Sequence, residues 1–213
     1  MLGTHDLALF IVSGLLLNMV PGPDSLLIMT RSAAQGWRAG SSAALGIGTG
    51  TLVHVFAAAL GLSAILATSA TAFMVVKLAG AAYLLYVGAQ LLFSKTKAAQ
   101  TDAAERPAPR LSRRQIFLQG LMTNVLNPKV ALFFLAFVPQ FIRPDAACKP
   151  AAFILLGFIF NFNGMLWCHF LALSSAFAGD KIKLNSGLVK WLNRLVGGVF
   201  VSLGLKLAFG RQH

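Results

Sequence analysis

The chain has 213 residues, of which 57% are hydrophobic and only 11% are charged. In a typical soluble domain about a quarter of all residues are charged, so this composition excludes an ordinary soluble globular protein. The net charge of +12 does not indicate nucleic-acid binding, because the basic residues lie between the apolar segments, where the positive-inside rule of membrane proteins explains them.

Six apolar segments follow one another along the chain, at roughly 6–30, 39–66, 71–93, 115–142, 150–174 and 187–209. Each is long enough to cross a bilayer, which takes about 20 residues of helix. Helices are expected because a segment in lipid must satisfy its own backbone hydrogen bonds. The first segment lacks the basic start and the cleavage site of a signal peptide, so we expect it to be retained. The sequence predicts an all-α membrane protein with six transmembrane helices.

Lys and Arg residues orient these six spans. The segments after spans one, three and five carry two, six and four of them, and the segments on the other side carry four. The richer side is expected to be cytoplasmic, which places both termini in the periplasm. Residues 94–114 are polar, contain two prolines and show no periodicity, and we interpret them as a cytoplasmic linker rather than a binding tail.

The linker divides the chain into two halves, 1–93 and 115–213, with three spans each. An odd number of spans gives the halves opposite orientations, as in the inverted repeats of many secondary transporters. A faint similarity supports this: in each half a Phe precedes a Pro by eleven positions with an Asn between them (Phe10, Asn18 and Pro21; Phe117, Asn124 and Pro128). We therefore predict two inverted three-helix repeats.

The first span is interrupted by the sequence VPGPD. Pro21 and Pro23 each remove a backbone donor, and Gly22 permits an unwound conformation. The helix is expected to stop near Pro21 and to restart at Pro23, since proline suits the first turn. Asp24 would then lie in the first turn of the second half-helix, where the helix dipole favours a negative charge.

The fourth span is interrupted in the same way by NVLNPK. Asn127 is a good N-cap and Pro128 a good first helical residue, so helices one and four are both expected to break near the midplane. Lys129 would lie in the first turn, where the dipole disfavours a cation, and a lysine inside the membrane costs at least about 2.5 kcal/mol. We expect Asp24, or an anionic group of a substrate, to offset this cost.

Two such breaks indicate a transport site. Half-helix N-termini that converge from opposite sides form an anion site, and Asp24 adds an acceptor for a cation or a proton. The alternative is a pair of proline kinks, which often merely bend membrane helices, with a structural pair between Asp24 and Lys129.

Four further polar residues lie within the spans. His54 and His169 could relay protons, although hydrogen-bonded packing is the commoner role of such residues. Asn161 and Asn163 could line a cavity or join helices by hydrogen bonds. No metal site or cofactor is expected, because carboxylate, His and Cys residues are not clustered in the spans.

The second span contains the glycine-rich stretch GIGTG at 46–50. It follows no strand, so a nucleotide-binding loop is excluded by context. The spacing of Gly46 and Gly50 is typical of closely packed membrane helices, within one protomer or between the two protomers of a homodimer.

These motifs together resemble the LysE/RhtB family of amino-acid exporters. The resemblance is carried by PGPD at 21–24, GWRAG at 36–40, NPKVALFF at 127–134 and PQF at 139–141, and it covers nearly the whole chain. It implies a six-span transporter of the bacterial inner membrane that exports amino acids or close derivatives, driven by the proton gradient. Substrates in the family include basic, hydroxyl-bearing, branched and sulfur-containing amino acids and homoserine lactone.

The resemblance agrees with the reading of the two breaks. An amino acid is a zwitterion and needs an anion site and a cation site close together. We expect the half-helix N-termini and Lys129 to bind its carboxylate, and Asp24 and unwound carbonyls near Gly22 to bind its ammonium group. A proton arriving at Asp24 would then displace the ammonium; facilitated exit without proton antiport stays open.

Three other classes of function would require different features of the sequence. An ion or metal exporter would need several carboxylate, His or Cys ligands within the spans. A membrane-embedded enzyme would need a partner for Asp24 or a spaced nucleophile and base. A scaffold would not need a charged residue at each of two helix breaks. We therefore predict a transporter of amino acids and not an enzyme, with lipid and protons as its other partners.

Overall fold

The computed structural model describes residues 2–62, 64, 70–93, 110–143, 145–178 and 186–209. The predicted linker 94–114 lies outside these residues as far as position 109. Helix α6 begins at Arg113, within the last two positions of the predicted linker. Ser112 caps that helix: its hydroxyl accepts from the Gln115 N–H at 3.3 Å, and the Gln115 side chain accepts from the Ser112 N–H at 2.9 Å.

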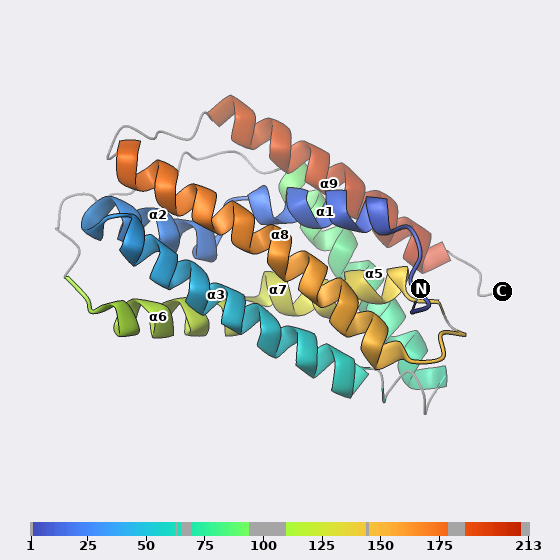
Figure 1. Ribbon diagram of the computed structural model, residues 1–213. Helices are drawn as coiled ribbons and strands as arrows, with labels where there is room; N and C mark the ends of the chain where they lie inside the picture. The colour runs from blue at the N-terminus through green and yellow to red at the C-terminus, as the bar shows by residue number, and fades with distance from the viewer. Residues whose placement is uncertain are drawn as a thin grey trace.

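Helices account for nearly all of the described chain, which forms a bundle in which α1 begins and α9 ends at the same end (Figure 1). In chain order they are α1 (Leu7–Met19), α2 (Pro23–Gln35), α3 (Trp37–Ala57), η1 (Ala58–Leu62), α5 (Ala70–Phe93), α6 (Arg113–Val125), α7 (Pro128–Leu132), η3 (Phe133–Phe137), η4 (Val138–Phe141), α8 (Lys149–Ala178) and α9 (Ser186–Phe209). The described parts of the six predicted segments are largely helical, apart from the two predicted breaks.

Both predicted breaks are present. The axis bends by 54° between α1 and α2 and by 47° between α6 and the run from Pro128 to Phe141. At the first break Val20 and Gly22 are extended and Pro23 opens the new helix. At the second break the Asn127 side chain accepts from the Lys129 N–H at 3.0 Å, as expected of an N-cap.

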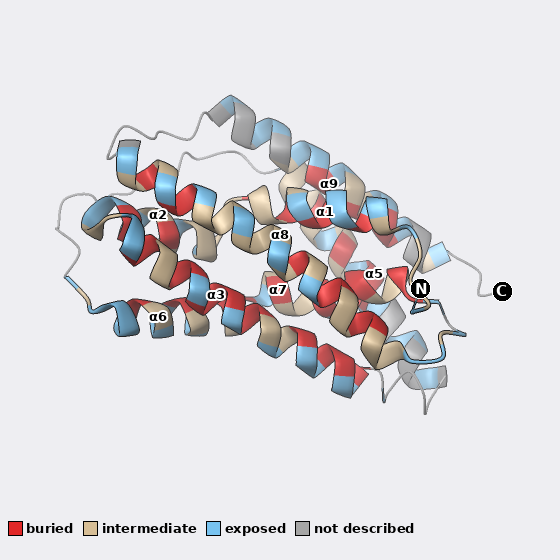
Figure 2. Ribbon diagram, in the orientation of Figure 1, coloured by how far each residue is buried: buried red, intermediate tan, exposed pale blue. Residues whose placement is uncertain are grey.

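By length and composition, two of the described helices can each cross a membrane, Trp37–Leu62 and Lys149–Phe177, and each bent pair adds one more. Shorter apolar stretches lie in α5 and α9, at Leu78–Phe93 and Asn193–Leu205. The outer surface supports the same conclusion. Exposed residues recur along α8 (Figure 2), and they include the large apolar Phe158, Phe162, Phe170 and Phe177. The fold is that of an all-helical membrane protein.

Helices α3 and α6 touch through their backbones. A Cβ atom at Gly46 would contact the carbonyl oxygen of Phe117, and one at Gly120 would contact the carbonyl oxygen of Ala43. A Cβ atom at Gly50 would lie 2.9 Å from the side chain of Asn124, also on α6. Gly46 and Gly50 therefore pack within the protomer, and they give no support to a homodimer.

Both ends of the bundle are tied across the two halves of the chain. At the end where α1 begins, the N–H of His5 donates to the carbonyl of Phe141 at 3.0 Å, and the N–H of Arg143 donates to the carbonyl of Gly3 at 2.8 Å. Phe10 packs nearby, with its ring centroid 5.2 Å from that of Phe141.

At the other end, α2 is tied to the start of α6. The amide of Gln35 donates to the Leu111 carbonyl at 2.9 Å and accepts from the Leu111 N–H at 3.1 Å. One turn further in, the buried guanidinium of Arg31 donates from Nε and Nη2 to Gln119 Oε1 at 3.2 and 3.0 Å. The breaks between α1 and α2 and between α6 and α7 lie between these two sets of hydrogen bonds.

Candidate functional site

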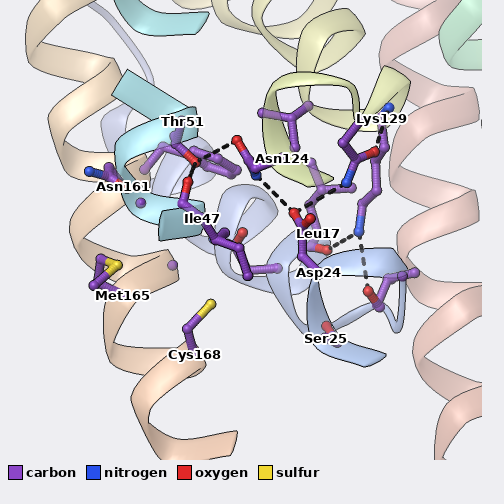
Figure 3. A pocket seen from close by; sticks show the side chains of 18 residues that line it. Leu17, Asp24, Ser25, Ile47, Thr51, Asn124, Lys129, Asn161, Met165 and Cys168 are labelled. Carbon is purple, nitrogen blue, oxygen red and sulfur yellow. Dashed lines mark hydrogen bonds between the residues drawn. The ribbon is translucent and has the colours of Figure 1, made fainter. Parts of the chain in front are cut away.

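A small cavity of about 50 Å³ lies between the two helix breaks (Figure 3). Its walls come from α1, α2, α3, α6, α7 and α8, so both halves of the chain contribute. The predicted residues Gly22, Asp24, Asn127, Lys129 and Asn161 line it. The predicted prolines Pro21, Pro23 and Pro128 do not line it, and they act by shaping the backbone around it.

Asp24 reaches across from α2 to the second break. Its Oδ2 atom accepts from Asn124 Nδ2 at 2.8 Å and from Asn127 Nδ2 at 3.2 Å. Its Oδ1 atom is buried and has no hydrogen-bond partner among the described residues. A buried carboxylate oxygen without a donor is costly, so Asp24 presents an open acceptor position in the cavity wall.

Lys129 binds the broken end of α1. Its Nζ donates to the Leu17 carbonyl at 2.8 Å and to the Val20 carbonyl at 3.2 Å. In an unbroken helix the Leu17 carbonyl would accept from the N–H of residue 21, but Pro21 has none. The break in the first span therefore creates the acceptors that Lys129 uses.

The direct pair between Asp24 and Lys129, which the sequence left open beside a substrate anion, is not formed. The ion pair found among the described residues joins His5 to Asp6, and no contact within ion-pair distance joins Asp24 to Lys129. The hydrogen-bond acceptors of Lys129 at the start of α7 are backbone carbonyls. Its ammonium group lies at the C-terminal end of α1, where the helix dipole favours a positive charge.

The two predicted helix N-termini differ. At the start of α7 the Asn127 side chain caps the N–H of Lys129. At the start of α2, Asp24 lies in the first turn and no side chain caps the backbone N–H groups.

Asn124 is the centre of a hydrogen-bond network. Besides its bond to Asp24, its Oδ1 atom lies 3.4 Å from the Thr51 hydroxyl, and its backbone carbonyl accepts from His54 Nε2 at 3.1 Å. His54 also stacks on Phe134, with ring centroids 6.4 Å apart. Packing and hydrogen bonding thus account for the contacts of His54, one step removed from Asp24.

The other three candidate residues differ in whether they line the cavity. Asn161 lines the cavity, whereas Asn163 and His169 do not. His169 Nδ1 lies 2.9 Å from the carbonyl of Met165 in its own helix. The structure therefore brings Asn161 to the site and leaves Asn163 and His169 outside it.

Sequence reasoning missed two asparagines as site residues. Asn124 binds Asp24 directly, and Asn18 lines the cavity with a buried Nδ2 atom that has no hydrogen-bond partner among the described residues. The available signal was their position, since each is an amide shortly before a break-forming proline. The sequence also gave no way to assemble the apolar wall, which includes Ile47, Phe160 and Met165.

The site thus has one carboxylate, one ammonium group, several amides and an apolar wall. No group of three or more His, Cys, Asp or Glu residues that could hold a metal ion occurs within the described part of the chain. A polar site formed by two broken helices of a membrane bundle is typical of secondary transporters.

Comparison with known proteins identifies the family to which this chain belongs. The model of the LysE type translocator family matches residues 15–211, and the chain belongs to that family. It is 31% identical over 208 residues to the leucine efflux protein of Klebsiella pneumoniae subsp. pneumoniae, a match that covers 97% of this chain and 96% of the relative.

Other relatives are as similar. The leucine efflux protein of Salmonella typhimurium is 31% identical, with 93% of this chain and 92% of the relative covered. The uncharacterized membrane protein YrhP of Bacillus subtilis is 31% identical, with 95% and 98% covered. No solved structure matches the chain. The family and these relatives support an amino-acid exporter and a multi-pass membrane protein.

Proposed function

We propose that the protein exports neutral, apolar α-amino acids of the leucine class from the cytoplasm, in exchange for protons. The observation that carries the proposal is the cavity between the two breaks, which holds one carboxylate, Asp24, and one ammonium group, Lys129, with no direct ion pair between them. A zwitterion adds one charge of each sign to such a site and leaves its charge balanced.

The free polar atoms of the cavity match an amino acid. The open Oδ1 atom of Asp24 is an acceptor for an ammonium group, and the open Nδ2 atom of Asn18 is a donor for a carboxylate. Groups that are buried without a partner cost stability until a ligand satisfies them. An α-amino acid supplies both missing partners in one molecule.

The side-chain end of the cavity favours a neutral substrate. Ile47, Phe160 and Met165 form an apolar wall, and Asp24 is the acidic residue among those that line the cavity. A lysine or arginine substrate would bring a second positive charge with no second carboxylate to receive it. The names of the leucine efflux relatives point to the same class.

The proton is expected to act at Asp24. The substrate binds from the cytoplasm while the carboxylate is charged, and a proton taken from the periplasm replaces the ammonium group and accompanies the return. The two halves, 1–93 and 115–213, would be inverted repeats of three spans that rock about the site. The linker 94–114 would be cytoplasmic, and both termini would lie outside the inner membrane.

Export from proteoliposomes tests the proposal. Vesicles loaded with radiolabelled leucine, threonine or lysine are followed with and without an imposed pH gradient. We expect gradient-driven efflux of leucine, little efflux of lysine, and loss of the gradient dependence in Asp24→Asn. Asp145→Asn, which changes an exposed carboxylate outside the cavity, is the matched control and should behave like the wild type.

Each outcome bears on a different part of the proposal. Leucine efflux that survives Asp24→Asn with its gradient dependence intact would make Asp24 a structural cap. Gradient-independent efflux in the wild type would indicate facilitated exit. Failure to export any amino acid would refute the proposed function.

A further inference from the structure

We propose that the ammonium group of Lys129 occupies, in the substrate-free protein, the subsite that receives the ammonium group of the substrate. Binding is then an exchange: the substrate's ammonium replaces that of Lys129 at the broken end of α1, and the released Lys129 pairs with the substrate's carboxylate. The proposal rests on the proposed function and names the recognition step of that site.

The first support is the chemistry of the acceptors. The Leu17 and Val20 carbonyls are backbone acceptors in the last turn of α1 and in the extended residue after it, and both residues line the same cavity as Asp24, which is the arrangement that suits a substrate ammonium group. Lys129 Nζ fills it at 2.8 and 3.2 Å. The two carbonyls lie at the C-terminal end of α1, whose dipole favours any cation at this position. The subsite therefore recognises an ammonium group and not lysine in particular.

The second support is the size of the cavity. Leu17, Val20, Asp24 and Lys129 all line the same space, whose volume is about 50 Å³. A single water needs about 10–15 Å³ measured in this way, so the space holds a few waters and is too small for leucine. A side chain of the wall must move before a substrate can bind, and the long Lys129 side chain lines the space.

The third support is the state of Asp24. One of its oxygens is satisfied by Asn124 and Asn127, and the other is buried and open. Lys129, although nearby in the same cavity, does not fill that open position. A substrate ammonium that took the place of Lys129 Nζ would complete the carbonyl set and gain a carboxylate acceptor that Lys129 does not use.

The exchange also links binding to movement. The bonds from Lys129 to Leu17 and Val20 join the second half of the chain to the first across both breaks. Substrate binding would release this tie at the moment the site is filled. The outward rearrangement of the two halves is then favoured in the protein that has bound a substrate.

Chemical rescue tests the subsite directly. Lys129→Ala removes the side chain beyond Cβ, and propylammonium supplies the missing atoms. We expect propylammonium at ten times its Kd to raise the Tm of Lys129→Ala by about 3–6 °C, with no such rise for the wild type. Lys190→Ala, at an exposed position of α9, is the matched control, and 1-propanol is the uncharged control ligand.

The outcomes are distinct. Stabilisation of Lys129→Ala by propylammonium alone supports the subsite. Equal stabilisation of the wild type would mean that the carbonyls are open while Lys129 is present, and absence of any effect on Lys129→Ala would mean that they do not form an ammonium site. Either result would overturn the proposal.

A second measurement uses the wild-type protein and remains informative if Lys129→Ala does not fold. Saturating leucine should change the rate of reductive methylation of Lys129 several-fold, with Lys190 unchanged as the internal control. An unchanged rate at Lys129 in a protein that exports leucine would refute the exchange. If no amino acid is exported, the proposed function fails, while the propylammonium result still decides whether the ammonium subsite exists.

Discussion

The crossing of α3 and α6 offers a direct test of how the fold positions the site. Gly46→Ala would place a methyl group against the backbone of α6, where the Cβ position lies 2.8 Å from Leu121 N and 2.9 Å from Phe117 C. Ordinary contacts of a Cβ atom begin at 3.4 Å. Because backbone atoms cannot rotate aside, the two helices must separate by about 0.5 Å or more.

This separation has a cost that can be stated. Overpacking of a dense interior costs about 1–3 kcal/mol, and the upper half of that range applies here because a helix pair must move. For a chain of this size we expect the Tm of Gly46→Ala to fall by about 4–12 °C. Export should fall further than stability, because α6 carries Asn124 and its 2.8 Å bond to Asp24.

The assay is thermal unfolding in detergent together with leucine efflux from proteoliposomes. Gly198→Ala is the matched control, because no atom lies within 4 Å of a Cβ at this exposed position of α9. Alanine in place of glycine within a helix should stabilise it by about 0.5–1 kcal/mol. A Tm for Gly46→Ala equal to that of Gly198→Ala would refute the close approach of α3 and α6.

Three further substitutions probe the site itself. Pro21→Ala supplies the N–H that a continuous helix would donate from residue 21 to the Leu17 carbonyl, so α1 should extend and leucine efflux should fall while the Tm is kept; a fully active variant would show that the break is not needed. Asn124→Leu removes a hydrogen bond to the charged Asp24, which is worth about 1.5–3 kcal/mol, and thermal unfolding should show a loss of that size; an unchanged Tm would contradict the bond. Met165→Ala enlarges the apolar wall and should raise export of phenylalanine relative to leucine by about tenfold or more, measured as a ratio of initial efflux rates; an unchanged ratio would exclude Met165 from side-chain selection.

Much of the fold could be predicted because the membrane restricts the choices. Apolar length fixed the helical positions, and the chemistry of Pro21 and Pro23 fixed the first break, since neither residue can donate to a helix. The N-cap at Asn127 was predicted for the same local reason and is confirmed by its bond to the Lys129 N–H. These features depend on residues that are neighbours in sequence.

The contacts across the site could not be predicted, because they join segments about a hundred residues apart. The sequence offered Asp24 or an anionic group of a substrate as the partner of Lys129, because Asp24 is the opposite charge at the other break. The backbone provides a different partner: Pro21 removes the N–H that an unbroken helix would donate to the Leu17 carbonyl, and this carbonyl accepts from Lys129 Nζ at 2.8 Å. Asp24 is then satisfied by amides and keeps one oxygen free. The same proline that breaks the helix therefore gives Lys129 an acceptor other than Asp24, and under the proposed function this leaves both charges open to a substrate that carries both signs.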